Sequence, residues 1–121
     1  MFIATSNPAN QLLVLNYVGR VDLAELQRHR GNLRQLLAGL APGFRVLADF
    51  SQLEAMDPDC LPEIAAMMEV LDETGVALVV RVIPDPRKDP GMNILSNFHY
   101  RMPPRVVACA NWEDALRALA L

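Results

Sequence analysis

Three carboxylates close to one apolar stretch are the residues best suited to chemistry in this sequence of 121 residues. Asp49 lies within the apolar run Phe44–Phe50, and Asp57 and Asp59 follow a short polar segment. Carboxylates that follow a parallel strand can hold Mg²⁺ at the carboxyl edge of a sheet. An enzyme that uses these three acids is therefore one interpretation of the sequence.

Two observations count against that interpretation. A phosphate-accepting receiver domain needs further acids after its first strand and a lysine after its last strand. Here the first apolar runs end in polar or basic residues, and no lysine follows Cys109. Asp57 also has a simpler role, because an Asp followed by Pro58 is typical of a helix start. We therefore expect no catalytic residue and no metal ion.

Other nucleophiles and metal ligands are sparse. Cys60 falls in the first turn of a predicted helix, where the helix dipole can lower a thiol pKa, but the acids just before it oppose that effect. His29 and His99 are isolated, and the chain has no zinc-like Cys/His spacing, no glycine-rich phosphate loop and no G-x-S-x-G elbow. The sequence thus predicts no cofactor, and Cys60 and Cys109 are expected to be reduced thiols.

Charged residues are segregated along the chain. The net charge of −3 argues against nucleic-acid binding. Eight acids and no base occupy Asp49–Glu73, whereas the segment Arg20–Arg45 holds five arginines against two acids. These segments are either two ordinary solvated helix faces or a polar surface that selects a charged partner.

Hydropathy argues against a membrane protein. No segment approaches the ~20 uninterrupted apolar residues of a membrane span. The stretch Met1–Asn10 lacks the basic and apolar regions of a secretory leader. We expect a cytoplasmic protein without membrane insertion.

Strand-like and helix-like segments alternate along most of the chain. Turn residues and helix caps divide it into predicted strands over 2–5, 12–18, 44–50, 76–83 and 105–109, and predicted helices over 22–40, 57–74, 89–98 and 111–119, with a loop over 51–56. The order β-β-α-β-α-β-α-β-α predicts an α/β fold with a mixed, mostly parallel sheet. Residues 1–121 have the size and composition of a single domain.

The second predicted helix carries the clearest apolar stripe. It is formed by Cys60, Leu61, Ile64, Met67, Met68 and Leu71, which should face the core, and Gly75 should end the helix as a left-handed cap. The acids Glu63, Glu69, Asp72 and Glu73 lie off the stripe and are expected to be exposed. Arg81 interrupts an apolar strand, and the sequence leaves open whether its side chain is buried.

The segment Val46–Asp57 resembles the STAS domain family, which includes bacterial anti-sigma factor antagonists and cytoplasmic domains of sulphate transporters. In that family an apolar strand ends in Asp-Leu-Ser, and an apolar residue followed by Asp-Ser-Ser-Gly-Leu then opens a helix. Asp49-Phe50-Ser51 is similar to the first part, and Met56-Asp57 with Leu61 is similar to the second. The order of elements and the closing segment Asn111–Leu116 also agree with the family.

This resemblance implies a STAS-like fold and a non-catalytic regulatory module that binds a partner protein. The partner-binding residues that it implies are Asp57, Pro58, Asp59, Cys60 and Glu63. The partner would be a regulatory protein, for example an anti-sigma-type kinase or a related switch protein, and a homodimer is also compatible. Pro58 and Asp59 stand where the family has its phosphorylated serine, so the resemblance does not extend to a phosphorylation switch.

A second interpretation is a domain that binds a small molecule or a lipid. Sheets of this type bind ligands at the ends of their strands. Met67, Met68, Met92 and Met102 could line an adaptable apolar pocket, although Met at helical spacing is also typical of a core. A deep apolar cavity would favour this alternative.

Overall fold

The chain begins with a β-hairpin that forms one side of its sheet. The structure is a computed structural model that describes residues 1–84 and 105–120. Strand β1 (Phe2–Asn7) runs antiparallel to β2 (Leu12–Val21) and is joined to it by a 3₁₀ turn, Pro8–Asn10. Gln11 completes the turn with a φ of 50°, and its backbone N–H donates to the carbonyl of Pro8.

Three further strands continue the sheet in parallel. They are β3 (Arg45–Met56), β4 (Leu78–Val82) and β5 (Arg105–Cys109), and among the described residues the strand order is β1-β2-β3-β4-β5. Pairs β2–β3, β3–β4 and β4–β5 are all parallel. The prediction of a mixed, mostly parallel sheet is therefore confirmed.

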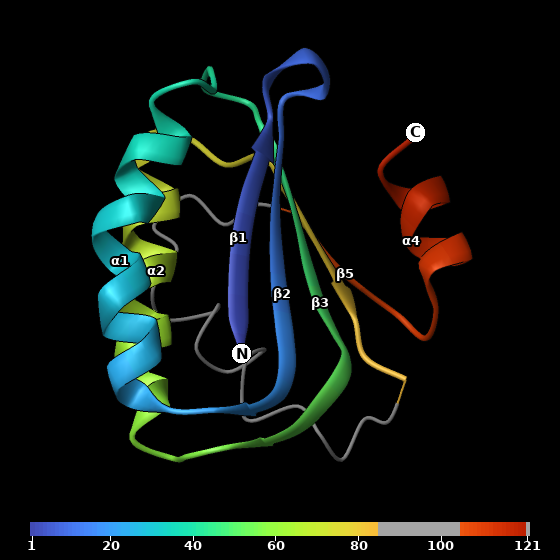
Figure 1. The fold of residues 1–121 in the computed structure, drawn as a ribbon. Coiled ribbons are helices and arrows are strands. Elements are labelled where there is room, and N and C mark those ends of the chain that lie inside the picture. The colour runs from blue at the N-terminus through green and yellow to red at the C-terminus, as the bar shows by residue number, and fades with distance from the viewer. Residues whose placement is uncertain (85–104, 121) are drawn as a thin grey trace.

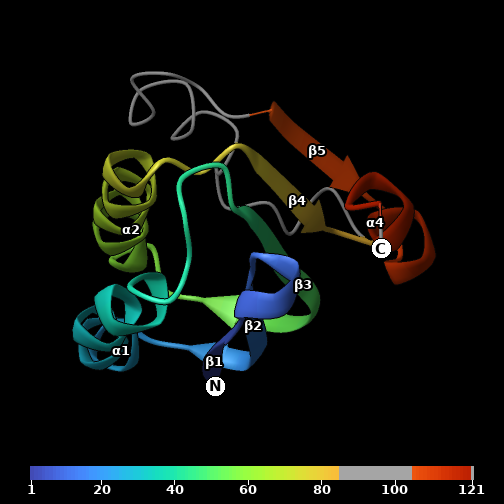
Figure 2. The same cartoon turned by 90° about the horizontal axis from the view of Figure 1, so that it is seen from above.

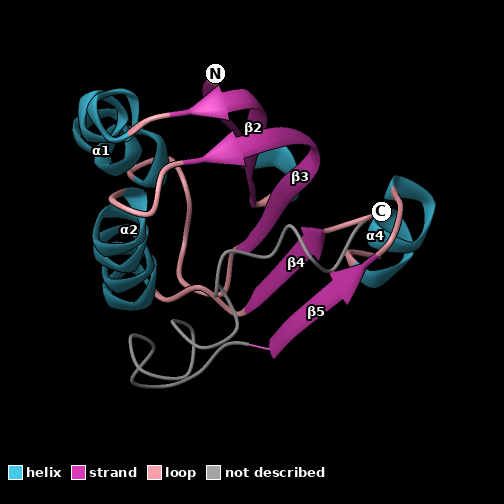
Figure 3. Ribbon diagram, turned by 90° about the horizontal axis from the view of Figure 1, so that it is seen from below, coloured by secondary structure: helices cyan, strands magenta, loops and turns pink. Residues whose placement is uncertain are grey.

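Helices cover both faces of this sheet. On one face, α1 (Leu23–Leu37) and α2 (Cys60–Thr74) lie side by side, and on the other face α4 (Trp112–Ala118) lies over β4 and β5 (Figures 1 and 2). The larger core fills the space under α1 and α2, and a smaller one lies under α4. Figure 3 shows the sheet between these two helical layers.

Local signals at the helix ends behave mostly as expected. The Asp22 carboxylate accepts a hydrogen bond from the backbone N–H of Glu25 at 2.9 Å, and Asn111 caps α4 in the same way. Gly75 ends α2 with a φ of 94°, and its N–H donates to the carbonyls of Leu71 and Asp72. A side chain at Gly75 would also crowd Pro42, since an added Cβ would lie 3.1 Å from the proline Cβ.

The prediction of a loop over 51–56 is wrong, because these residues continue strand β3. They pair with the second half of β2, across register shifts between Asn16 and Val18 and between Gly19 and Arg20. The segment Ser51–Met56 buries Leu53 and exposes Gln52 and Glu54, which is the alternation of a strand. The predicted strand over 12–18 was correspondingly too short.

The start of α2 also differs from the prediction. The cap position is occupied by Asp59 and not by Asp57. Asp59 has helical φ and ψ angles, and its side chain makes no capping hydrogen bond. The helix that we predicted over 89–98 lies outside the described residues. In the part of the chain that the structure describes, no helix is long and apolar enough to cross a membrane.

The apolar stripe of α2 is largely confirmed. Cys60, Ile64, Met67, Met68 and Leu71 are buried in the larger core. Leu61 is the exception, because its side chain is half-buried at the start of the helix.

Candidate functional site

The predicted partner-binding residues surround the turn that joins β3 to α2. Pro58 and Asp59 are exposed at the tip of this turn, and Asp57 is half-exposed. The turn is closed by two backbone hydrogen bonds, from Cys60 N–H to the Asp57 carbonyl at 2.9 Å and from Leu61 N–H to the Pro58 carbonyl at 3.1 Å. We call Asp57–Asp59 the junction turn.

Strand β2 holds the junction turn from one side. The Arg20 guanidinium donates a hydrogen bond of 2.9 Å to the Asp57 carboxylate, and the Asp57 N–H lies 3.4 Å from the Val21 carbonyl. Parallel strands bring their carboxyl ends to the same edge of a sheet, so the end of β2 and the end of β3 meet here. Asp57 therefore fixes the turn and does not cap the helix as predicted.

Cys60 anchors the turn from below. Its side chain is fully buried, and Sγ lies 3.7 Å from the Val21 carbonyl. Burial raises the pKa of the Cys60 thiol, and the negative charges of Asp57 and Asp22 raise it further. The predicted core role of this cysteine is confirmed, and the thiol is shielded from solvent.

Glu63 is not exposed as predicted. It is only 7% exposed, because it faces α1 across the helix pair. Its Oε1 lies 3.2 Å from Nε of Arg30, but the two groups do not have the alignment of a hydrogen bond. Arg30 is about half-exposed, so the pair lies at the rim of the interface between the helices.

A second ion pair lies further along the same two helices. Arg34 Nη2 is 3.9 Å from Glu73 Oε2, and both side chains are mostly exposed. The basic α1 and the acidic α2 thus lie side by side and pair with one another. Part of the charge segregation seen in the sequence is therefore used inside the molecule.

Asp49 belongs to a different place in the fold. It is buried within β3, where one carboxylate oxygen accepts from Ser51 N–H at 2.8 Å and the other accepts from Trp112 Nε1 at 2.9 Å. Met56 lies seven positions further along the strand, which is roughly 20 Å at the usual rise of a strand. Asp49 therefore does not join Asp57 and Asp59 in one site.

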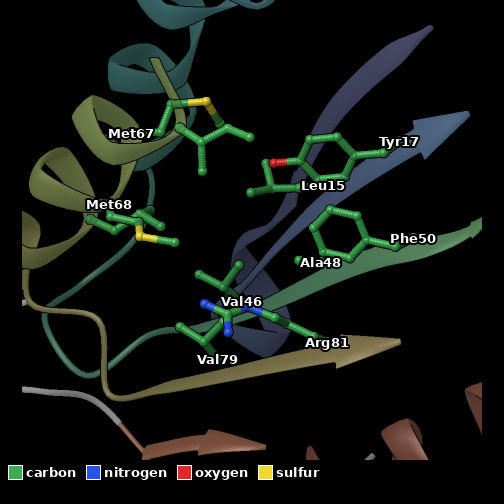
Figure 4. A pocket seen from close by; sticks show the side chains of 11 residues that line it. Leu15, Tyr17, Val46, Ala48, Phe50, Met67, Met68, Val79 and Arg81 are labelled. Atoms are coloured by element: carbon green, nitrogen blue, oxygen red, sulfur yellow. The ribbon is translucent and has the colours of Figure 1, made fainter. Parts of the chain in front are cut away.

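The described residues form no cluster of metal ligands, and the apolar cavity beside Arg81 is small. Within them, no three His, Cys, Asp or Glu side chains gather in a way that could hold a metal ion. An apolar cavity of about 30 Å³ lies between the sheet and α2, and Arg81 borders it with its guanidinium beside Val46 and Val79 (Figure 4). Arg81 is buried, at 2% exposed, and the cavity has room for about one water molecule.

The structure therefore brings four of the five predicted residues into one place. Asp57, Pro58, Asp59 and Cys60 form the junction turn and its anchor, whereas Glu63 faces α1. Arg20 is the residue at this turn that sequence reasoning missed. Its position at the end of a strand parallel to β3 was the available signal.

Solved structures resemble this chain over nearly its whole length. The anti-sigma factor antagonist SpoIIAA in its unphosphorylated form matches with a TM-score of 0.67 and 16% identity, covering 99% of this chain and 98% of that one. The phosphorylated form of SpoIIAA from Bacillus matches with a TM-score of 0.64 and 16% identity, covering 98% and 99%.

Two further structures have the same architecture. An uncharacterised protein of the DUF3478 family with a SpoIIAA-like fold, from Shewanella loihica PV-4, matches with a TM-score of 0.73 and 15% identity, covering 98% of this chain and 92% of that one. An anti-sigma factor antagonist from Mycobacterium paratuberculosis matches with a TM-score of 0.61 and 20% identity, covering 100% and 94%. No protein-family model and no curated protein matches the chain.

These matches define the class of fold. The chain is a mixed α/β protein with a five-stranded sheet among its described residues. It has the SpoIIAA-like fold of STAS domains, as the resemblance of Val46–Asp57 predicted.

Proposed function

We propose that this chain is a non-catalytic regulatory module that binds a partner protein through the junction turn and the first turn of α2. The observation that carries the proposal is the exposed pair Pro58–Asp59 on a fixed support. Arg20 holds one side of the turn, and the buried Cys60 holds the other. A surface that is already ordered loses little entropy when it binds.

The charge around the turn favours a basic partner. Asp22, at the start of α1, and Asp57 and Asp59 all act on the Cys60 thiol through their charges, so they share one end of the molecule. Glu54 is exposed on the adjoining part of β3. Complementary exposed charges raise the rate of association more than they raise affinity.

The residue types at the turn favour a permanent binding surface over a phosphorylation switch. Pro58 and Asp59 carry no hydroxyl group, and Ser51 is the nearest serine or threonine before them. Asp59 places one negative charge at the helix start, where a phosphoserine would bring about −1.5 to −2. We infer that the module works in the cytoplasm with a regulatory partner, such as a protein related to anti-sigma kinases, and is not switched at this position.

Intact-mass measurement tests the absence of a switch. The purified chain is incubated with ATP and a candidate serine kinase encoded beside it, and phosphopeptides are mapped. We expect no phosphate within residues 51–61. A phosphate on Ser51 would contradict the proposal of a permanent surface.

Capture from lysate followed by purified binding tests the partner-binding surface. Asp59→Lys reverses a charge on the junction turn, and Glu113→Lys reverses an exposed charge on α4 at the opposite side of the sheet. We expect the captured protein to bind Glu113→Lys like the wild type and to bind Asp59→Lys at least about tenfold more weakly. Equal binding to all three chains would refute this surface.

A further inference from the structure

The outer edge of β1 carries backbone groups that point away from the sheet. Met1 and Val18 exchange both backbone hydrogen bonds, and the β1–β2 register then runs without a shift to Asn7. In an antiparallel pair, bonded and non-bonded residue pairs alternate. The N–H and C=O groups of Phe2, Ala4 and Ser6 therefore point outward.

One of these groups is already used. The Phe2 N–H donates to the Glu25 carboxylate of α1. Among the described strands β1 pairs only with β2, so the outward groups of Ala4 and Ser6 have no strand beside them. Within residues 1–84 and 105–120, the edge thus offers two N–H donors and the carbonyls of Phe2, Ala4 and Ser6.

The sequence of β1 lacks the usual protection of an exposed edge. Natural edge strands are commonly blocked by charged side chains, by proline or by a bulge. Phe2–Asn7 contains no charged residue, no proline and no bulge, and Pro8 comes only after the strand has ended. Such an edge can accept another strand.

A groove of about 320 Å³ runs between this edge and α1. Phe2 and Ala4 form its strand side, and His29, Asn32 and Leu36 form its helix side. None of the α1 residues that line the groove is an acid, a lysine or an arginine, and the nearby Glu25 carboxylate is paired with the amino terminus. An extended peptide that pairs with β1 would place alternate side chains in this groove.

We propose that the β1 edge and the α1 wall bind an extended, uncharged peptide segment of a partner protein as an additional strand. The unused backbone groups recognise an extended main chain. The amide and imidazole side chains of the wall fit small polar or apolar side chains at alternate positions of the peptide. This site lies at the hairpin side of the sheet and is independent of the junction turn.

An isolated strand fits this edge better than a second copy of the chain. Pairing β1 with β1 of a second copy about a two-fold axis would place both α1 helices on the same face of the continued sheet, over the same groove. Packed helices need about 8–10 Å between their axes. A peptide brings no helix with it.

Selection of displayed hexapeptides on the wild-type chain tests the proposal. Two variants serve as a matched pair: Ala4→Pro removes the outward N–H without removing a bond to β2, and Ala4→Ser keeps that N–H. We expect the selected peptides to be uncharged, to bind Ala4→Ser within about twofold of the wild type and to bind Ala4→Pro at least about tenfold more weakly. Circular dichroism verifies that both variants are folded.

Hydrogen exchange of the complex with a selected peptide gives a second measurement that does not need a variant. The amides of Ala4 and Ser6 should become protected on binding, whereas those of Ile3 and Thr5, which already pair with β2, should not change. Peptides that bind Ala4→Pro as well as the wild type would overturn the proposal. Changes in exchange at other amides only would also overturn it. A wild-type dimer that Ala4→Pro dissociates would overturn it too, because the edge would then bind a second copy of the chain.

Discussion

Two parts of the acidic run Asp49–Glu73 lie in different environments. At the junction turn, Pro58 and Asp59 are exposed. Along α2, by contrast, Glu63 is buried against α1 beside Arg30, and Glu73 lies near Arg34. Acids that look equivalent in the sequence therefore have different roles. Glu63 and Glu73 of α2 face cations of the neighbouring helix, and Asp59 at the turn is exposed.

The largest expected effect concerns the buried side of α2, which holds both environments in place. Leu71 is 4% exposed, and Leu→Ala at such a site costs about 2–5 kcal/mol of the free energy of unfolding. Leu61 is half-buried beside the junction turn, so Leu61→Ala should cost less than half as much. Urea unfolding of the two variants measures the difference, and equal losses would show that the helix start is packed as tightly as its end.

The next effect is the protection of Cys60 under the turn. The pKa values of both thiols are raised, but Cys60 is fully buried whereas Cys109 is half-exposed. We expect iodoacetamide to alkylate Cys60 at least about tenfold more slowly than Cys109 at pH 8, because the buried thiol must be uncovered first. Mass spectrometry of the two cysteine peptides over time measures both rates, and equal rates would mean that the turn opens freely.

The same thiol makes stability depend on alkaline pH. The pKa of Cys60 is raised in the folded state above its usual 9.0, so the unfolded chain releases its thiol proton at lower pH than the folded chain does. The contribution of the protonated Cys60 thiol to the stability of the fold is complete below pH 9.0. It is lost as the pH rises through the higher pKa of the folded state. A Cys60→Ala variant should show a weaker loss of stability than the wild type above that pH.

A smaller effect separates the two ion pairs between α1 and α2. Arg30→Ala leaves the buried carboxylate of Glu63 without its cation and should destabilise the fold by about 1 kcal/mol. This loss is smaller than for a fully buried pair, because solvent around Arg30 screens the interaction. Arg34→Ala breaks an exposed pair and should cost less than about 0.5 kcal/mol. Thermal unfolding in low salt compares the two variants. A larger loss of stability in Arg34→Ala than in Arg30→Ala would show that the exposed pair matters more than the buried carboxylate.

Much of the fold follows from local sequence patterns. The apolar stripe of α2, its Gly75 cap and the alternation of strands and helices all predict what the structure contains. These patterns depend on neighbours in the sequence, so they can be recognised without tertiary contacts.

Other features depend on contacts between distant segments and could not be predicted in this way. Ser51–Met56 becomes a strand because β2 is long enough to pair with it. Asp57 leaves its predicted capping role because Arg20 lies across the sheet edge. Glu63 is buried because α1 supplies Arg30 beside it. In each case a partner that is remote in the sequence determines the environment.

The rate of association with the captured partner is the measurement that tests the central claim most directly. It compares Asp59→Lys on the junction turn with Glu73→Lys on α2 at two salt concentrations. We predict that Asp59→Lys lowers the association rate constant at least about tenfold in low salt, that raised salt reduces this difference, and that Glu73→Lys changes the rate less than about threefold. If Glu73→Lys slows association as much as Asp59→Lys does, the account is contradicted, because the acids of α2 would then belong to the binding surface.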